Sequence, residues 1–283
     1  MKLLEGLRVV STALNLPGPV ACARLAELGA AVTKVEPPTG DPFAGYCGAW
    51  YERLHAGVEV RTIDLKGDEG RRAMQSLLEA ADLLLTAQRP AALARMGLDA
   101  AVVATLHPRL CQVAITGHAP PDDGTAGHDL TYMAVNGLVV PPALPATLFA
   151  DMAGAERAVS TALALVMARD REGRGGRATV ALADAARYLA QPLREGLTRP
   201  AAMLGGGLAG YNIYATRAGW IAVAALEPHF ARRLAESLGL PALTEAGLRD
   251  KFLADTAMQW ERWARALDLP LVALRTPFTE NVC

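Results

Sequence analysis

Three short polar segments interrupt an otherwise apolar, alanine-rich sequence, and each contains an imidazole or a carboxylate. The segments are Gly127-His128-Asp129, Phe149-Ala150-Asp151-Met152-Ala153-Gly154 and Leu226-Glu227-Pro228. Histidine and carboxylate side chains are the groups that proteins use to move protons near neutral pH. Each segment lies where a predicted loop meets a predicted helix, and side chains at such junctions can project into a cleft. The pattern therefore indicates acid–base chemistry.

In the first half of the chain, apolar runs rich in β-branched residues alternate with helical patterns. We expect strands at 7–10, 31–35, 82–86 and 110–116, and helices at 19–28 and 68–80. Pro19 falls near the first turn of the earlier helix and Gly29 directly follows its end, as is usual for these residue types. Alternating strands and helices of this length predict a parallel sheet with right-handed crossovers, and so a doubly wound, Rossmann-like α/β domain.

The second half follows a different pattern. A long alanine-rich helix is expected at 154–169, a strand at 178–182, and a helix from Asp184. Pro and Gly accumulate over 191–210 without periodicity, as in a linker. The runs 211–214 and 220–224 resemble a hairpin, and helices follow from Pro228. We therefore expect a large domain at 1–190 that carries His128 and Asp151, a linker at 191–210 and a smaller α+β domain at 211–283.

Composition limits the class of protein. The 283 residues are 52% apolar and 20% charged, with a formal net charge of −1, which is typical of a globular protein and does not favour nucleic-acid binding. The N-terminus reaches a charge before any signal-like apolar run, and no uncharged apolar stretch approaches the length of a membrane span. We therefore expect a cytoplasmic protein without a membrane partner. The spacing of the cysteines predicts buried, reduced thiols at Cys22 and Cys111 and no metal site.

Glycine-rich cofactor motifs are absent or incomplete. The loop 14–19 after the first predicted strand lacks the G-x-G-x-x-G fingerprint, which disfavours a nicotinamide or flavin cofactor. The run 205–207 has no preceding strand and no following Lys-Ser or Lys-Thr, so it does not match a P-loop. It is interpreted as a flexible loop over a site.

Several ordered motifs resemble the family III CoA-transferases, the CaiB/BaiF-like proteins. The motifs are Leu4-x-Gly6-x-Arg8-Val9-Val10, Leu25-Ala26-x-Leu28-Gly29-Ala30-x-Val32-x-Lys34-Val35-Glu36-Pro37-Pro38-x-Gly40-Asp41, Asp64-Leu65-Lys66-x-x-Glu69-Gly70-Arg71, Arg89-Pro90 and His107-Pro108-Arg109-Leu110. Two further segments, 126–137 and 225–230, look most like the α-methylacyl-CoA racemase branch. The resemblance covers roughly residues 3 to 240.

The resemblance implies a racemase that acts on 2-methylacyl-CoA through an enolate by 1,1-proton transfer. His128 and Asp151 would act on opposite faces of the substrate Cα, because inversion needs one group to remove the α-proton and another to return it. Glu227 would pair with His128. The resemblance also implies an interlocked homodimer and no cofactor other than the coenzyme A of the substrate.

Two sets of residues complete the expected site. Backbone N–H groups at the start of a helix stabilise developing negative charge, so Met152, Ala153 and Gly154 are expected to stabilise the enolate. Where the family commonly has a basic stretch, this chain has the segment 55–61, with fewer cations. Lys34, Arg89 and Arg95 remain as candidates for contact with the CoA phosphates.

Each of these residues also has a purely structural interpretation. Asp151 precedes a predicted helix and could cap it, which would stabilise the fold by about 1 kcal/mol. Asp129 is expected to cap the helix that contains Tyr132, and Glu227 could be a carboxylate favoured by a helix dipole. His118 is a second candidate imidazole, although the Gly-His-Asp segment favours His128.

Alternative functions stay open. Asp151 could be the nucleophile of a CoA-transferase, which needs only the carboxylate. The chain could also be a non-catalytic paralogue or subunit, or a racemase whose acyl group is carried on the phosphopantetheine of a carrier protein.

Overall fold

The β-branched runs of the first half assemble into one sheet. In the computed structural model, which describes residues 2–275, its strands are β1 (Arg8–Ser11), β2 (Ala31–Glu36), β3 (Val58–Thr62), β4 (Leu83–Thr86), β5 (Cys111–Thr116) and β6 (Arg177–Ala181). Their order is β3-β2-β1-β4-β5-β6, and every neighbouring pair is parallel. This is the strand order of doubly wound dinucleotide-binding folds, in which the sheet grows in opposite directions from β1. The predicted fold class is confirmed.

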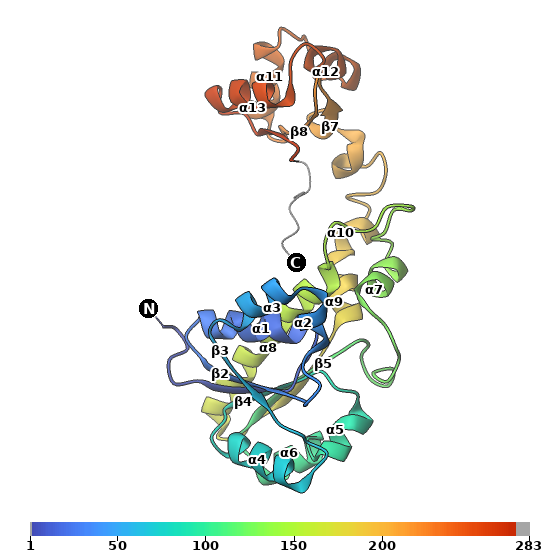
Figure 1. Cartoon of the computed structure of the whole chain (residues 1–283). Helices are drawn as coiled ribbons and strands as arrows, with labels where there is room; N and C mark the ends of the chain where they lie inside the picture. The colour runs from blue at the N-terminus through green and yellow to red at the C-terminus, as the bar shows by residue number, and fades with distance from the viewer. Residues whose placement is uncertain (1, 276–283) are drawn as a thin grey trace. The chain divides into compact units, whose positions relative to one another are not determined.

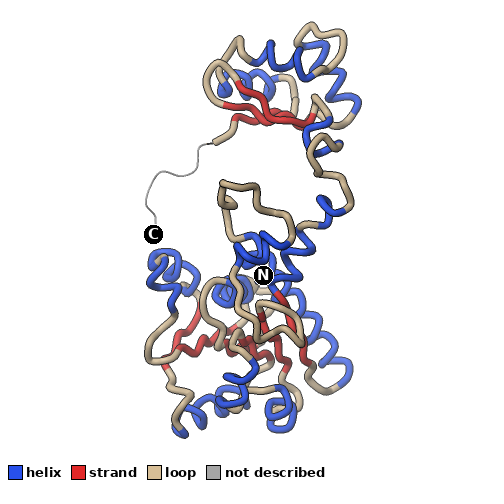
Figure 2. The backbone as a smooth tube through the Cα atoms, turned by 90° about the vertical axis from the view of Figure 1, so that its right-hand side faces the viewer, coloured by secondary structure: helices blue, strands red, loops and turns tan. Residues whose placement is uncertain are grey.

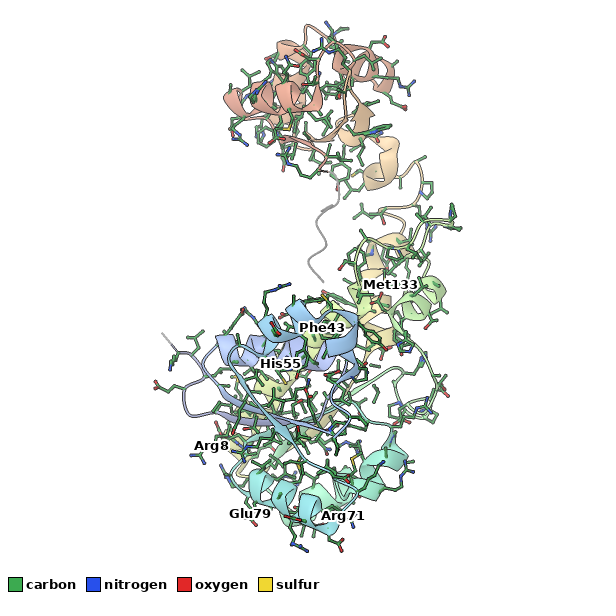
Figure 3. All side chains as sticks on the ribbon, in the orientation of Figure 1. Arg8, Phe43, His55, Arg71, Glu79 and Met133 are labelled. Atoms are coloured by element: carbon green, nitrogen blue, oxygen red, sulfur yellow. The ribbon has the colours of Figure 1, made fainter. Side chains whose placement is uncertain are left out.

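Helices cover both faces of this sheet (Figure 1). One layer contains α1 (Pro17–Glu27), α2 (Pro42–Tyr46), α3 (Gly48–His55) and α8 (Phe149–Glu172), and the other contains α4 (Asp68–Glu79), α5 (Pro90–Met96) and α6 (Ala100–Leu106). The labelled side chains of Phe43 and His55 mark the first layer in Figure 3, and those of Arg71 and Glu79 mark the second.

Alternate residues of the strands enter the two cores because successive side chains of a strand point to opposite faces. Val9 and Leu83 belong to the hydrophobic cluster that contains the side chains of α1 and α8. Val10 and Leu84 belong to the cluster on the other face, with Met74 of α4. Strands buried on both faces explain why the sequence shows continuous apolar runs rather than alternation.

The long helix α8 begins at Phe149, five residues before the predicted start. It presents small buried side chains to α1 and β5, so the helix packs closely on the sheet. It ends at Glu172, and Gly173 follows with φ of 77°, a left-handed conformation that favours glycine. Two shorter helices, α7 (Asp129–Val135) and α9 (Leu182–Leu189), pack on one another and on α8.

One strand of the sheet was not predicted. β3 pairs with β2 through Val32 and Val58, and it overlaps the segment 55–61, which the sequence analysis noted only for its few cations. Most of its side chains are exposed at the edge of the sheet. Its sequence Val-Glu-Val-Arg-Thr alternates apolar and polar residues, as a half-buried strand does, so the signal was present and the prediction missed it.

The chain divides into two compact units after Ala190. The second unit contains α10 (Gln191–Arg194), the short helical turn η1 (Met203–Gly207), β7 (Tyr211–Ala215), β8 (Trp220–Ala224), α11 (Pro228–Ser237), α12 (Glu245–Phe252), α13 (Ala257–Ala266) and β9 (Leu271–Ala273). The segment predicted to be a linker thus contains α10 and η1. Strands β7 and β8 form the predicted antiparallel hairpin, and β9, which was not predicted, pairs with β8.

The three-stranded sheet of the second unit has helices on one face (Figure 2). Tyr214, Ile221 and Val223 point into the core on that face, where they pack with Leu234 and Phe252. The hairpin was predictable because its two runs are apolar and flank a short polar turn. β9 has only three residues, too few for a periodic signal.

Other expectations concern cysteines, metals and membranes. Cys22 and Cys111 are buried free thiols, as predicted. Burial raises the pKa of the Cys22 thiol to about 11. Among residues 2–275, no three His, Cys, Asp or Glu side chains are grouped so that they could hold a metal ion. None of the helices that the structure describes combines the length and the apolar character needed to span a bilayer.

Candidate active site

His128 lies at the end of the loop that follows β5, directly before the first residue of α7. Its backbone is fixed by Thr131, whose hydroxyl donates to the His128 carbonyl at 2.7 Å and accepts from the His128 N–H at 3.1 Å. The residue itself is exposed. An anchored backbone and an exposed imidazole suit a group that exchanges protons with a bound molecule.

Asp151 is the third residue of α8, so the alternative interpretation of this residue as the cap of the helix does not hold. The residue before the helix is Leu148, and the carboxylate of Asp151 lies in the first turn. The backbone N–H of Asp151 donates to Oδ1 of Asp129 at 3.0 Å. Because Asp129 directly follows His128, this bond brings the start of α7 and the start of α8 together, and with them the two predicted catalytic residues.

Asp129 does not cap α7 as predicted. It is the first residue of that helix, and its carboxylate accepts from the first turn of α8 instead. This acceptor satisfies one of the N–H groups that have no partner within their own helix. The carboxylate is buried, with 4% of the residue exposed.

The pKa of Asp151 is raised from 3.8 to about 7, first by burial and then by the negative charge of Asp129. Both effects disfavour the ionised form of a carboxyl group. The pKa of the Tyr132 hydroxyl is raised as well, by burial and then by the charges of Asp151 and Asp129. A carboxyl group that titrates near neutral pH can both accept and donate a proton, which is the property of an acid–base catalyst.

Tyr132 holds the loop that carries His128. A Cβ on Gly127 would lie 2.5 Å from Cε1 of Tyr132, and one on Gly117 would lie 2.3 Å from its hydroxyl oxygen. Glycine is therefore needed at both positions for the loop to pack on the ring. His118, the second candidate imidazole, packs edge-on against Tyr132 with the ring centroids 5.3 Å apart.

The predicted enolate-stabilising groups are not at the helix start. The N–H of Met152 donates to the Leu148 carbonyl at 3.0 Å, and Ala153 and Gly154 are further inside α8. A Cβ on Gly154 would lie 2.2 Å from Cδ2 of Leu182, so this glycine allows α9 to pack closely on α8 rather than a thioester oxygen to approach. The prediction is wrong because the helix begins earlier than its pattern indicated.

Glu227 belongs to the second unit, where it immediately precedes α11. It is exposed, and its side chain makes no capping bond to the helix. The carboxylate therefore does not serve as the cap of α11. Its pairing with His128 stays a prediction.

A cleft of about 630 Å³ lies at the carboxyl ends of β1 to β4 in the first unit. Its lining includes Thr12 after β1, Pro37 after β2 and Gln88 after β4, and the cationic side chains in it are those of Lys66, Arg71 and Arg95. In open α/β sheets, ligands bind outside the carboxyl ends of the strands, where the strand order reverses. Here that point lies between β1 and β4.

Two of the three predicted phosphate contacts do not line this cleft. Arg89 is exposed directly before α5, and Lys34 is fully buried in β2. Nζ of Lys34 lies 2.8 Å from Oε1 of Glu36, 2.5 Å from Oδ2 of Asp41 and 3.0 Å from Nε2 of His55. Since those groups surround the ammonium, it cannot reach a phosphate in solvent, and the prediction for Lys34 is wrong. Arg95 does line the cleft.

Sequence reasoning assigned no role to Lys66 or Arg71, although both belong to a quoted motif. Nη2 of Arg71 lies 2.5 Å from Oδ1 of Asp68, while Lys66 and Arg95 form no ion pair within residues 2–275. The position of Lys66 just beyond the carboxyl end of β3 is the signal that could have identified it, had β3 been predicted.

Comparison with known proteins identifies the family of the chain. Residues 4–281 match the sequence description of CoA-transferase family III. Human alpha-methylacyl-CoA racemase is 30% identical over 259 residues, which cover 84% of this chain and 65% of that protein. Cinnamoyl-CoA:phenyllactate CoA-transferase of Clostridium sporogenes is 30% identical over 208 residues, 66% of this chain and 50% of that enzyme. The chain therefore spans half to two thirds of the length of these two relatives.

Solved structures show the same fold. The crystal structure of Rv3272 from Mycobacterium tuberculosis superposes with a TM-score of 0.84 and 26% identity, over 96% of this chain and 84% of that chain. A CAIB/BAIF family protein from Brucella suis gives a TM-score of 0.79 over 96% of this chain and 84% of that one, at 21% identity. Because the family description matches nearly the whole sequence and the fold agrees, this chain belongs to CoA-transferase family III.

Proposed function

We propose that the protein is a racemase or epimerase of 2-methylacyl thioesters. One catalytic group removes the proton from the substrate Cα, the electron pair of the broken C–H bond passes into the thioester as an enolate, and a group on the opposite face returns a proton to Cα. His128 and Asp151 are the two groups. The observation that carries this proposal is the carboxyl group of Asp151, whose pKa of about 7 suits proton transfer in both directions.

The transferase alternative makes a different demand on Asp151. A carboxylate nucleophile attacks in its ionised form, and a pKa raised to about 7 leaves part of the population protonated at neutral pH. A two-base racemase instead needs the carboxyl group to alternate between both forms. The environment of Asp151 therefore favours the racemase, although relatives of both kinds are similar to this chain.

Glu227 and the oligomeric state belong to the same proposal. We assign Glu227 the role of pairing with His128, because it is an exposed carboxylate free of its own helix. An interlocked homodimer is expected to complete the site. Light scattering in solution should give twice the mass of the chain, and Glu227→Gln should lower the exchange rate without changing that mass.

The cleft at the carboxyl ends of β1 to β4 is proposed to hold the nucleotide part of coenzyme A. Lys66 and Arg95 would contact its phosphates, because Lys and Arg are the usual partners of phosphate oxygens. Replacing both by Ala should raise KM for an acyl-CoA and leave KM for the matching acyl-pantetheine unchanged. Arg89→Ala is the matched control, since Arg89 does not line the cleft. An equal effect on both thioesters would contradict the assignment.

Proton exchange at Cα is the decisive test. In D₂O with a single epimer of a 2-methylacyl-CoA, the protein should introduce deuterium at Cα and produce a mixture of epimers, followed by NMR and chiral chromatography. A straight-chain thioester without an α-branch is the control, because it can exchange without a change of configuration. Transfer of CoA to an added carboxylic acid without α-exchange would contradict the racemase.

Trapping separates the two enzymes directly. The transferase forms an acyl anhydride and then an aspartyl thioester on Asp151, both of which react with hydroxylamine or borohydride. The racemase forms neither, so mass spectrometry should find an unmodified Asp151 after incubation with substrate and trap. If exchange is slow with acyl-CoA, the same assay with an acyl group on a carrier-protein phosphopantetheine tests the remaining variant.

A further inference from the structure

Asp129 is a buried carboxylate that forms no ion pair with a cation of residues 2–275. Only 4% of the residue is exposed, and it forms no ion pair within the described part of the chain. A buried charge usually has a counter-charge, because burial without one is costly. Asp129 directly follows His128 in the sequence, and its Oδ1 accepts a hydrogen bond from the N–H of Asp151 at 3.0 Å. The charge therefore lies beside the two proposed catalytic groups.

The same arrangement leaves Asp151 among groups that do not neutralise it. On α7, the charge of Asp129 raises the pKa of Asp151, and the charge of Asp151 raises the pKa of Tyr132. His118, in the loop after β5, packs on the Tyr132 ring. The first turn of α9 carries one acidic residue, Asp184. Its Oδ1 lies 3.2 Å from Nη2 of Arg187, so its charge is paired. Asp151 itself is in no ion pair in residues 2–275.

We propose that Asp129 is a positioning residue that sets both the place and the protonation of Asp151. Its carboxylate fixes the first turn of α8 through the N–H of Asp151, and its negative charge opposes ionisation of the Asp151 side chain. The second effect makes Asp151 an acid as well as a base in the working pH range. The proposal rests on the proposed function, because it assumes that Asp151 transfers protons.

Helix capping alone would need only an acceptor, and an amide oxygen serves that purpose. Asp129→Asn keeps an oxygen that can accept from the N–H of Asp151 and removes the charge. If Asp129 only caps α8, this substitution changes nothing at Asp151. If its charge acts on Asp151, the carboxyl group of Asp151 must ionise at lower pH in the variant. The single substitution thus separates the two roles.

The direct test is a titration of the Asp151 carboxyl carbon by ¹³C NMR, with the signal assigned from Asp151→Asn. In the unmodified protein the midpoint should lie at about pH 7. In Asp129→Asn we expect it to fall by about one pH unit or more. Asp184→Asn, which also removes one carboxylate from a neighbouring helix, should leave the midpoint unchanged. An identical midpoint in Asp129→Asn and the unmodified protein would overturn the proposal.

A kinetic readout connects this titration to proton transfer. In the His128→Ala background Asp151 is the remaining base, so deuterium exchange should increase with pH through the Asp151 midpoint. Adding Asp129→Asn should move that increase to lower pH by the same amount. A shifted NMR midpoint without exchange in any variant would support the coupling of the two carboxylates and contradict the racemase. If exchange occurs but neither the NMR midpoint nor the pH dependence of exchange shifts, the role of Asp129 is overturned and the racemase proposal stands.

Discussion

Replacing Asp151 by Asn should stabilise the first unit at alkaline pH while removing proton exchange. Burial and the charge of Asp129 raise the pKa of Asp151 from 3.8 to about 7. The folded protein therefore holds this proton over a pH range in which the unfolded chain has released it, so stability falls as the pH rises through that range. The cost is absent below the unfolded-state pKa and complete above the folded-state pKa. Asn carries no charge and does not incur it.

The size of the effect follows from the same two values. The pKa difference is about three units, and each unit corresponds to about 1.4 kcal/mol, so the ceiling is about 4 kcal/mol. The side chain keeps some contact with solvent, which screens its charge, and we take about 2 kcal/mol as the expected gain above pH 7. For a unit of this size, each kcal/mol raises Tm by about 2–4 °C. Asp151→Asn should thus raise Tm by about 4–8 °C at pH 8.

Calorimetry at two pH values tests this reasoning. At pH 5 only about a third of the stabilisation should remain. That pH lies about a third of the way from the unfolded-state pKa of 3.8 to the folded-state pKa of about 7. Asp184→Asn is the control, since that partly exposed carboxylate pairs with Arg187 and its loss should change stability by less than about 0.5 kcal/mol at either pH. A gain that is the same at pH 5 and pH 8, or a loss at both, would refute the ionisation argument.

Three other substitutions test separate parts of the structure. His128→Ala should slow racemisation about 10²–10⁴-fold in the chiral assay while Asp151 still exchanges the α-proton of one epimer slowly; wild-type turnover would remove His128 from the site. Lys34→Met should lower the free energy of unfolding by about 3–5 kcal/mol in urea, because it leaves two buried carboxylates without their cation; a loss of CoA affinity without a loss of stability would restore the phosphate-binding role. Gly127→Ala should destabilise by about 1–3 kcal/mol and slow exchange, because its Cβ would collide with Tyr132; unchanged activity would show that the ring does not hold the loop.

The helices and strands could be predicted where the burial of their side chains produces a local pattern of apolar residues in the sequence. Strands β1, β2, β4 and β5 are apolar runs covered on both faces, so composition alone marks them, and the hairpin of β7 and β8 is equally clear. Edge strand β3 exposes most of its side chains and is not a continuous apolar run, so its only signal is the alternation Val-Glu-Val-Arg. The start of α8 was predicted too late. Its first turn contains exposed Phe149 and is held by the bond from the Asp151 N–H to Asp129, a contact that no local pattern reports.

The candidate site shows where sequence reasoning ends. The types of His128 and Asp151 could be recognised, but the effect of Asp129 on Asp151 depends on a contact between residues 22 positions apart in the chain. No local pattern reports such a contact. Lys34 illustrates the opposite error: a lysine in a central parallel strand is covered by helices on both faces, so its charge must be neutralised inside the protein. A basic residue can thus be inferred to bind phosphate only after its strand has been placed at the rim of the sheet, as Lys66 has been.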